Sequence, residues 1–170
     1  MIRWLVGVVL GALVMHFAAI AALPHAIMRG AMSRLQATPV NTFAHGPLAT
    51  AASRAIVRPS PDLAYSSLVF DVSEHALAVR VPLTPPYTSL SGFAANTDNF
   101  FAINDRTAGA SEIEIVLVGP ATPRRDLGSA RIVEAPSERG ILLVRRVVPS
   151  AEAFAEIDAV RRRASARLVP

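Results

Sequence analysis

Two short stretches of the sequence gather polar and charged side chains that could bind a ligand or accept a proton. The candidates are Arg58, Asp62 and Tyr65 in RPSPDLAYSS (58–67), and Asn104, Asp105 and Arg106 in NTDNFFAINDRT (96–107). An arginine holds a carboxylate through two parallel hydrogen bonds, and a tyrosine ring offers a small ligand a flat apolar wall. A carboxylate such as Asp62 or Asp105 can instead act as a general base. The chemistry at issue is therefore small-ligand binding or proton transfer.

Each stretch also has an ordinary structural interpretation. Asp62 follows Pro59 and Pro61, and its side chain fits a turn in which it bonds the nearby backbone. Asn104 and Asp105 follow an apolar run, at a place where both residue types tolerate left-handed backbone and bond locally. The sequence leaves the site and the turn interpretations open.

Other kinds of catalytic site are disfavoured by what the sequence lacks. It contains no cysteine, and its 4 histidines are scattered without the H-E-x-x-H spacing of a helix-borne zinc site. It has no G-x-S-x-G elbow for a nucleophilic serine and no glycine-rich phosphate loop. We therefore expect neither a metal nor another cofactor. Nucleic acid is not expected as a partner either. All 17 Lys and Arg positions are arginine, and their one cluster, Arg161–Arg163 with Arg167, has no interleaved aromatic residues.

The N-terminal part of the chain contains an apolar, uncharged segment at residues 4–23. About 20 residues of helix span about 30 Å, the thickness of a bilayer's hydrocarbon core. We expect Pro24 to end this helix. A cleaved signal peptide is the alternative, with Arg3 before the apolar run and a small-residue cleavage site at Ala19–Ala21. The run exceeds the ~7–15 apolar residues of a typical signal peptide, which favours an uncleaved anchor whose short N-terminus stays in the cytoplasm.

Three features of this segment bear on its partners. Trp4 lies at one end, where its ring suits the headgroup region, and Leu23 lies at the other end. Gly7 and Gly11 form a G-x-x-x-G pair, which predicts close packing of two such helices in a homodimer. His16 lies at mid-span, but a lone imidazole without a partner carboxylate is assigned no role. The lipid bilayer is thus the predicted partner, and a second copy of the chain is a further hypothesis.

The remaining sequence predicts a connecting region and a β domain. Residues 25–36 place apolar side chains near one helical face, which predicts a short amphipathic helix interrupted by Gly30, and 37–52 is predicted to be a linker. From residue 53 the pattern changes to period two. Strands are predicted at 63–72, 77–81, 87–94, 99–103, 112–118, 131–135 and 141–148. The predicted units are therefore 1–24, 25–52 and 53–170.

The chain is expected to end in a helix that follows Ser150 as N-cap and runs to Arg163. Phe154, Ile157 and Val160 recur at helical spacing and should face the sheet. The arginine run at the end of this helix is predicted to be solvated, because positive charge there complements the helix dipole. The predicted fold is mainly β: an antiparallel β-sandwich-like domain with a C-terminal α-helix, preceded by one N-terminal transmembrane helix.

The two polar stretches also resemble blocks of a known family. The matching residues are Ser33-Arg34-Leu35, RPSPDLAYSS (58–67), FDVS (70–73), Pro86-Tyr87, Ser89, Ser91, Asn96, Asn99, Phe101, Asn104–Thr107, Gly119-Pro120 and Arg145. On these residues the chain resembles the short, membrane-anchored members of the bacterial family called domain of unknown function 1254. The resemblance covers roughly 53–165 and adds Tyr87 and Arg145 to the candidates. It implies a β-sandwich-like domain in the bacterial envelope and no established activity. Members often carry Asp where this chain has Ala94, so a site that included that carboxylate is altered here.

These observations predict a single-pass protein of the bacterial inner membrane whose periplasmic domain binds a small ligand or an envelope protein. The alternative is a hydrolase-like envelope enzyme that uses Asp62 or Asp105 as general base. The residues proposed for binding are Arg58, Asp62, Tyr65, Tyr87, Asn104, Asp105, Arg106 and Arg145. If they form a site, they should lie together and not at opposite ends of the sandwich.

Overall fold

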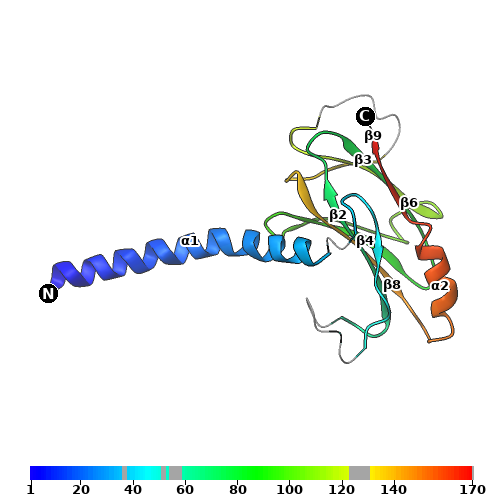
Figure 1. Ribbon diagram of the computed structural model, residues 1–170, viewed down its shortest axis with the longest axis horizontal. Helices are drawn as coiled ribbons and strands as arrows, with labels where there is room; N and C mark the ends of the chain where they lie inside the picture. The colour runs from blue at the N-terminus through cyan, green and yellow to red at the C-terminus, as the bar shows by residue number, and fades with distance from the viewer. Residues whose placement is uncertain (36–37, 51–52, 54–58, 123–130, 170) are drawn as a thin grey trace.

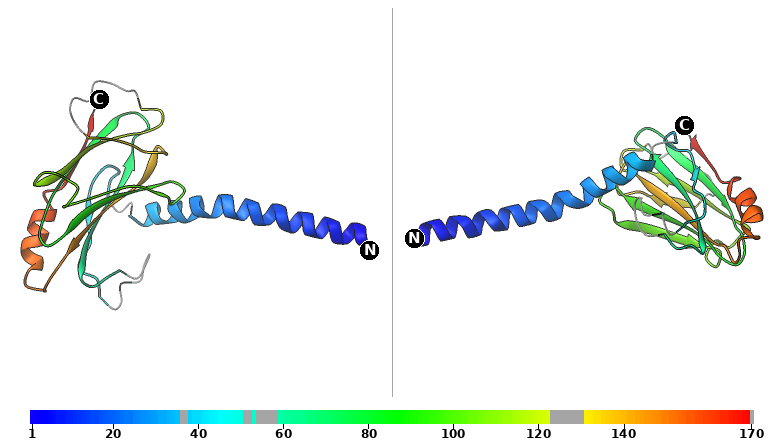
Figure 2. Two further views of the ribbon diagram at one scale, coloured as in Figure 1. Left: turned by 180° about the vertical axis from the view of Figure 1, so that it is seen from behind. Right: turned by 60° about the horizontal axis from the view of Figure 1, so that its bottom comes forward.

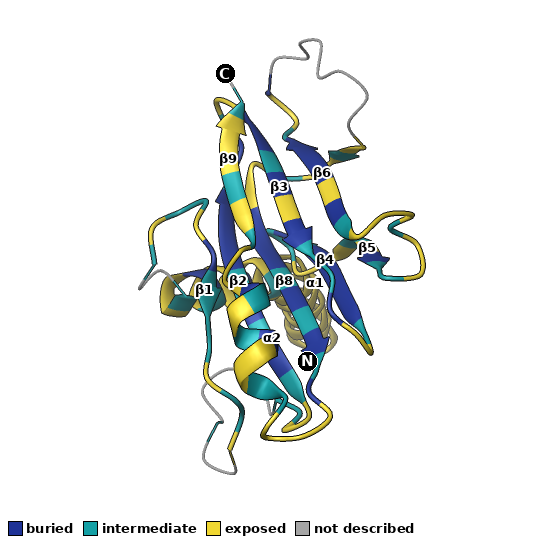
Figure 3. Ribbon diagram, turned by 90° about the vertical axis from the view of Figure 1, so that its right-hand side faces the viewer, coloured by how far each residue is buried: buried dark blue, intermediate teal, exposed yellow. Residues whose placement is uncertain are grey.

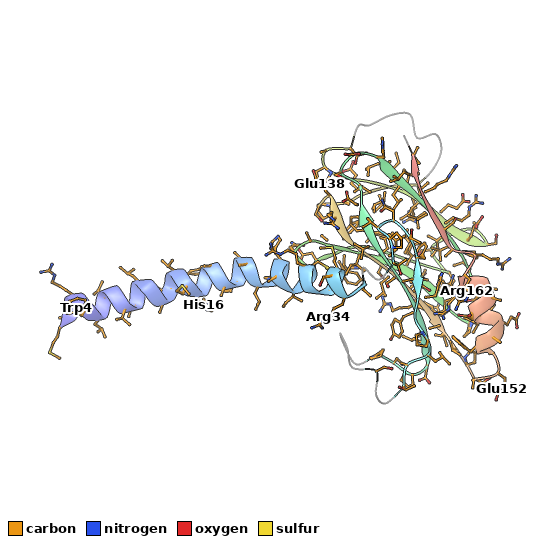
Figure 4. The ribbon with its side chains drawn as sticks, in the orientation of Figure 1. Trp4, His16, Arg34, Glu138, Glu152 and Arg162 are labelled. Atoms are coloured by element: carbon orange, nitrogen blue, oxygen red, sulfur yellow. The ribbon has the colours of Figure 1, made fainter. Side chains whose placement is uncertain are left out.

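A long N-terminal helix projects from a two-layer β domain (Figure 1). The structure, a computed structural model, describes residues 1–35, 38–50, 53, 59–122 and 131–169. The helix, α1 (Ile2–Leu35), is long and apolar enough to cross a membrane, with a mean hydropathy of 2.4 over an 18-residue window. A signal sequence would share these properties. Figure 4 shows Trp4 and His16 on the part of α1 that lies away from the β domain.

The predicted break between a membrane segment and a second helix is wrong. α1 runs through Pro24 and Gly30 without interruption, so the segments predicted at 4–23 and 25–36 form one helix. A proline inside a helix removes one backbone hydrogen bond, but the alanine, leucine and methionine residues around it favour helix. The apolar stretch and the residues that pack on the β domain therefore belong to a single element.

The β domain consists of two sheets, which we call sheet A and sheet B. Sheet A has the order β1 (Ala44–His45), β2 (Leu63–Asp71), β8 (Arg139–Val147), β4 (Thr88–Ala94) and β5 (Asn99–Asn104). Sheet B has the order β7 (Ile132–Glu134), β6 (Glu112–Val118), β3 (Ala76–Pro82) and β9 (Ser165–Val169). Neighbouring strands are antiparallel except for the parallel pair of β6 and β7. The predicted sandwich is confirmed, and each strand predicted from alternation is present.

An apolar core lies between the two sheets. Its side chains come from alternate positions of the strands and include Leu68, Phe70, Leu77, Val79, Leu90, Ile113, Ile115, Leu117, Leu142 and Val144. Figure 3 shows this alternation of buried and exposed positions along β3 and β6. Burial of each large apolar side chain stabilises the fold by about 1.5–3 kcal/mol, so this core is the main source of stability.

The helix α1 meets the β domain on the outer face of sheet A. Met28 and Met32 are buried there against Val69 of β2 and Ile141 of β8, with Phe93 of β4 packed beside them. The two further views in Figure 2 show α1 leaving this side of the domain as one rod. The helix α2 lies on the opposite side of the domain (Figure 1).

The C-terminal part of the chain differs from the prediction. The helix α2 (Phe154–Arg161) is shorter than expected, and its N-cap position is Ala153 without a side-chain cap. Ser150 only accepts a 3.4 Å hydrogen bond from the Ala153 amide, within the turn before α2. The chain then adds the edge strand β9, which pairs with β3 and was not predicted. Its sequence, SARLV, has weak alternation because all of its residues are exposed or half-buried.

Arg161, predicted to be solvated, is instead 1% exposed. Its Nη1 donates to the Tyr65 carbonyl at 2.9 Å, its Nη2 to the Gly46 carbonyl at 2.7 Å and its Nε to Asp158 at 2.6 Å. The side chain therefore ties α2 to β2 and to the segment that follows β1. Of the three arginines in the run, only Arg162 and Arg163 are exposed.

Candidate functional site

A row of four side chains crosses sheet A on its outer face. Tyr65 of β2 is paired with Arg145 of β8, Arg145 with Ser89 of β4, and Ser89 with Asn104 of β5. Directly paired residues of antiparallel strands point to the same face of the sheet, so we call these four residues the Arg145 row. Strands lie about 4.8 Å apart, which gives the row a length of about 14 Å.

The row lies on the outer face because the neighbours of Arg145 in the strand point into the core. Val144 and Arg146 are both 0% exposed and belong to the interior. Successive side chains of a strand point to opposite faces, so Arg145 points outward, toward the side on which α1 packs. It lies four positions after Ile141, the contact of α1 in the same strand.

Arg145 is a half-buried cation. Its Nη2 donates to Ser91 at 3.3 Å, and its Nε is buried without a hydrogen-bond partner. The neighbouring Ser89 is 3% exposed, and its hydroxyl is also unpartnered. In the described part of the chain Arg145 makes no ion pair, in contrast with Arg139 in the same strand, which pairs with Asp71 at 3.3 Å. The row thus holds hydrogen-bonding groups that the described protein atoms do not satisfy.

The other residues predicted from the first polar stretch lie at the same end of sheet A. The Tyr65 hydroxyl accepts a hydrogen bond from the Ser60 amide at 3.0 Å, which fixes the loop before β2. Asp62 is exposed, and its carbonyl accepts a hydrogen bond from the Val148 amide at 2.8 Å. Arg58 falls outside the described residues.

The second stretch forms the turn that its sequence allowed. The Asn104 side-chain oxygen accepts hydrogen bonds from the amides of Arg106 and Thr107, each at 3.1 Å. Arg106 is exposed and makes no ion pair within the described ranges. Asp105 differs, because its amide donates to the Thr88 carbonyl at 3.0 Å while its Oδ1 is buried without a partner. Asn104 therefore has a structural role, and Asp105 keeps one free acceptor.

The described candidates are brought together because β2 and β4 begin at the end of sheet A where β8 and β5 end. Tyr87, half-buried just before β4, lies there too, and its carbonyl accepts a hydrogen bond from the Val147 amide at 3.1 Å. Tyr65, Arg145 and Asn104 share the row, while the remaining candidates flank it. The arrangement is an open row on a sheet and can bind a small anion through Arg145 and the serine hydroxyls.

The family to which the chain belongs follows from a comparison with family models. A model described as "Protein of unknown function (DUF1254)" matches residues 40–167. The chain belongs to this family. The matched range includes the whole Arg145 row, and it confirms the resemblance seen in the sequence.

Two solved structures are similar to the DUF1254 chain in fold. The VPA0106 protein from Vibrio parahaemolyticus matches with a TM-score of 0.67 and 16% identity, over 89% of this chain and 37% of that chain. An uncharacterized protein from Burkholderia cenocepacia matches with a TM-score of 0.52 and 14% identity, over 77% of this chain and 35% of that chain. The DUF1254 chain thus corresponds to little more than a third of each. No curated protein matches it.

Sequence reasoning missed polar residues on both faces of this DUF1254 domain. Ser89 and Ser91 are buried beside Arg145 on the outer face. Arg146, on the inner face, is fully buried: its Nη2 donates to the Pro82 carbonyl at 2.7 Å, and its Nε and Nη1 have no partner. Burial, with the nearby Arg161 charge adding to it, lowers the pKa of Arg146 to about 10. The alternation of side chains in ILLVRRVV could have predicted the buried arginine, because a strand points one of two adjacent arginines into the core.

A histidine lies near the same end of the interior. His45 bonds the Ser66 hydroxyl through Nδ1 at 2.8 Å. Burial lowers the pKa of His45, and the charges of Arg161 and Arg162 lower it further. The imidazole is therefore neutral near pH 7 and serves as a hydrogen-bonding group. In the described part of the domain no three residues are grouped as metal ligands.

Proposed function

We propose that this protein is a module of the bacterial inner membrane, anchored by α1, whose periplasmic β domain binds a small anionic ligand at Arg145. The observation that carries this function is the half-buried guanidinium of Arg145, which makes no ion pair with the described residues, beside the unpartnered hydroxyl of Ser89. Tyr65 and Tyr87 flank the position and supply apolar surface. The anchor is supported by the length and hydropathy of α1.

The energetics of hydrogen bonding favour a ligand at this position. A buried polar atom without a partner costs about 1–3 kcal/mol, and charged groups cost more. Phosphate and carboxylate oxygens match the planar fork of a guanidinium and would also accept from a serine hydroxyl. Arg139 and Arg80 need no such ligand, because Arg139 pairs with Asp71 and Arg80 pairs with Glu112 and Glu114.

Thermal unfolding of the full chain in detergent tests this function. Inorganic phosphate and succinate are added separately at constant ionic strength, and at least one is expected to raise Tm by stabilising the bound state. The rise should persist in Arg139→Gln and disappear in Arg145→Gln. Arg139→Gln is a matched control, since it removes an arginine from the same face of the same strand. A wild-type Tm that neither anion raises would contradict the proposal, as would an equal rise in Arg145→Gln.

A second candidate function is a hydrolase-like enzyme with a carboxylate as general base. The buried, unpartnered Oδ1 of Asp105 favours Asp105 over the exposed Asp62 in that role. A panel of chromogenic carboxylic and phosphoric esters provides the assay. An enzyme of this kind should lose turnover in Asp105→Asn and keep it in Asp62→Asn, whereas a binding module should hydrolyse none of the esters.

A further inference from the structure

The direction of α1 determines which face of the β domain looks toward a membrane that the helix crosses. Met28 and Met32 are buried on the outer face of sheet A. Figure 3 looks roughly along α1, and the strands of both sheets extend across that view. The sheets therefore lie across the helix axis, with sheet A on the side of the apolar stretch and α2 on the far side (Figure 1).

The spacing along α1 brings this face to the level of the lipid headgroups. Leu23, the end of the predicted membrane segment, is five residues before Met28, which corresponds to about 7.5 Å of helix. The headgroup layer adds about 5–8 Å to each side of the hydrocarbon core. Because α1 continues through Pro24, no flexible linker intervenes in this spacing. The outer face of sheet A then stands against the bilayer surface.

The arginines of α1 lie beside this face. Arg29 and Arg34 are exposed on the part of α1 beyond the apolar stretch, and Figure 4 shows Arg34 at the base of the helix. On the sheet itself Arg139 offsets Asp71, which leaves Arg145 as the uncompensated charge among the described residues of the face. Two carboxylates, Asp62 and Asp105, lie at the end of the sheet beyond the row.

We propose that the anion bound by Arg145 is the phosphate of an anionic membrane lipid in the leaflet beside sheet A. This inference rests on the proposed function and names its ligand. A guanidinium near the bilayer surface is matched to a lipid phosphate in charge and geometry. The bilayer presents that phosphate at the height of the row, so binding needs no soluble ligand. Arg145 gives this contact a defined position, because its Nη2 is held by Ser91.

Lipid selectivity of the full chain tests the inference. The purified protein is placed in mixed micelles with equal amounts of phosphatidylglycerol and phosphatidylcholine, and bound lipids are counted by native mass spectrometry. One arginine near an anionic surface is worth about a fivefold preference. We expect the wild-type chain and Arg139→Gln to prefer phosphatidylglycerol, and Arg145→Gln to lose about fivefold of that preference. Arg145→Lys, which keeps the charge without the fork, should keep part of it, and circular dichroism establishes that each variant is folded.

The outcomes separate the lipid inference from the proposed function. A preference that is unchanged in Arg145→Gln overturns the inference and assigns lipid binding to the arginines of α1. Glycerol 3-phosphate, the soluble form of the headgroup, provides the second arm. If it raises Tm through Arg145 while no lipid preference appears, the small-anion site stands and the membrane source is wrong. If neither the lipid preference nor the rise in Tm with glycerol 3-phosphate depends on Arg145, both proposals fail.

Discussion

Arg161 connects three parts of the chain through one side chain. It donates to carbonyls of β2 and of Gly46 and pairs with Asp158, whose pKa is lowered mainly by a hydrogen bond from Arg162. Its guanidinium also lies over the Phe154 ring, with the guanidinium carbon 5.2 Å from the ring centroid. Such a side chain stabilises the fold because it satisfies two carbonyl groups, those of Tyr65 and Gly46, that are distant from it in the sequence.

Arg161→Met should therefore destabilise the fold by about 3 kcal/mol, because it leaves two carbonyls and a carboxylate without this donor. Arg162→Met is the matched control: it also removes a partner of Asp158, but its side chain is 58% exposed. An exposed ion pair contributes about 0–1 kcal/mol. Urea unfolding of the full chain measures both changes, and equal losses in the two variants would contradict the assigned role.

At the residue scale, the burial of an arginine side chain was not predicted from the sequence. Arg161 follows Phe154 and Ile157 by seven and four residues, so helical spacing, which the prediction of a solvated end did not take into account, puts it on the sheet-facing side. The preference for positive charge at a helix end pointed to solvent, and it was the weaker argument. The buried state depends on carbonyl groups of Tyr65 and Gly46, which are distant in sequence.

At the scale of elements, alternation predicted the strands because both sheets bury one face in a common core. The same signal failed for β9, an edge strand with little buried surface, and composition alone did not show that α1 would pass through Pro24. The Arg145 row depends on strand order, since β8 lies between β2 and β4. A sequence pattern predicts strands but not their neighbours, so Ser89 was not connected with Arg145.

Gly140, near the start of β8, provides a test of how closely β8 packs against its neighbours Phe93 and Phe70. A Cβ on Gly140 would collide with the Phe93 carbonyl and lie 2.6 Å from Phe70 Cζ. Gly140→Ala should therefore cost about 1–3 kcal/mol through overpacking. In Gly46→Ala the nearest atom, the Tyr65 carbonyl oxygen, would be 3.8 Å away, so this control should change stability little. Calorimetry of the two variants decides the point; similar Tm values would show that β8 can shift.

At the scale of the whole molecule, the anchor and its orientation are open to a direct test. The chain has no cysteine, so single cysteines can be introduced as unique labels. In spheroplasts, a membrane-impermeant maleimide should label Ser165→Cys, on exposed β9, and should label Ile2→Cys only after lysis. The reverse pattern would overturn the periplasmic placement. An intact mass that lacks the apolar stretch would instead identify a cleaved signal peptide.

Self-association of the anchor stays a prediction. Gly7 and Gly11 lie on open helix surface, since a Cβ built on either would meet no atom within 4 Å. Two helices could approach closely there, and the β domains would then lie side by side above the membrane.

The apolar stretch and the residues that pack on sheet A belong to one continuous helix, α1, and this limits how the β domain can move. If α1 spans the membrane as proposed, the β domain can turn about the helix axis and drift laterally, and it tips only as far as α1 itself tilts, about 20° on average. Arg145 lies four residues along β8 from Ile141, a distance of about 13 Å, so rotation carries it around a ring of about that radius. In the proposed membrane arrangement, Arg145 would therefore meet a binding partner within a ring in the plane of the membrane, centred on α1.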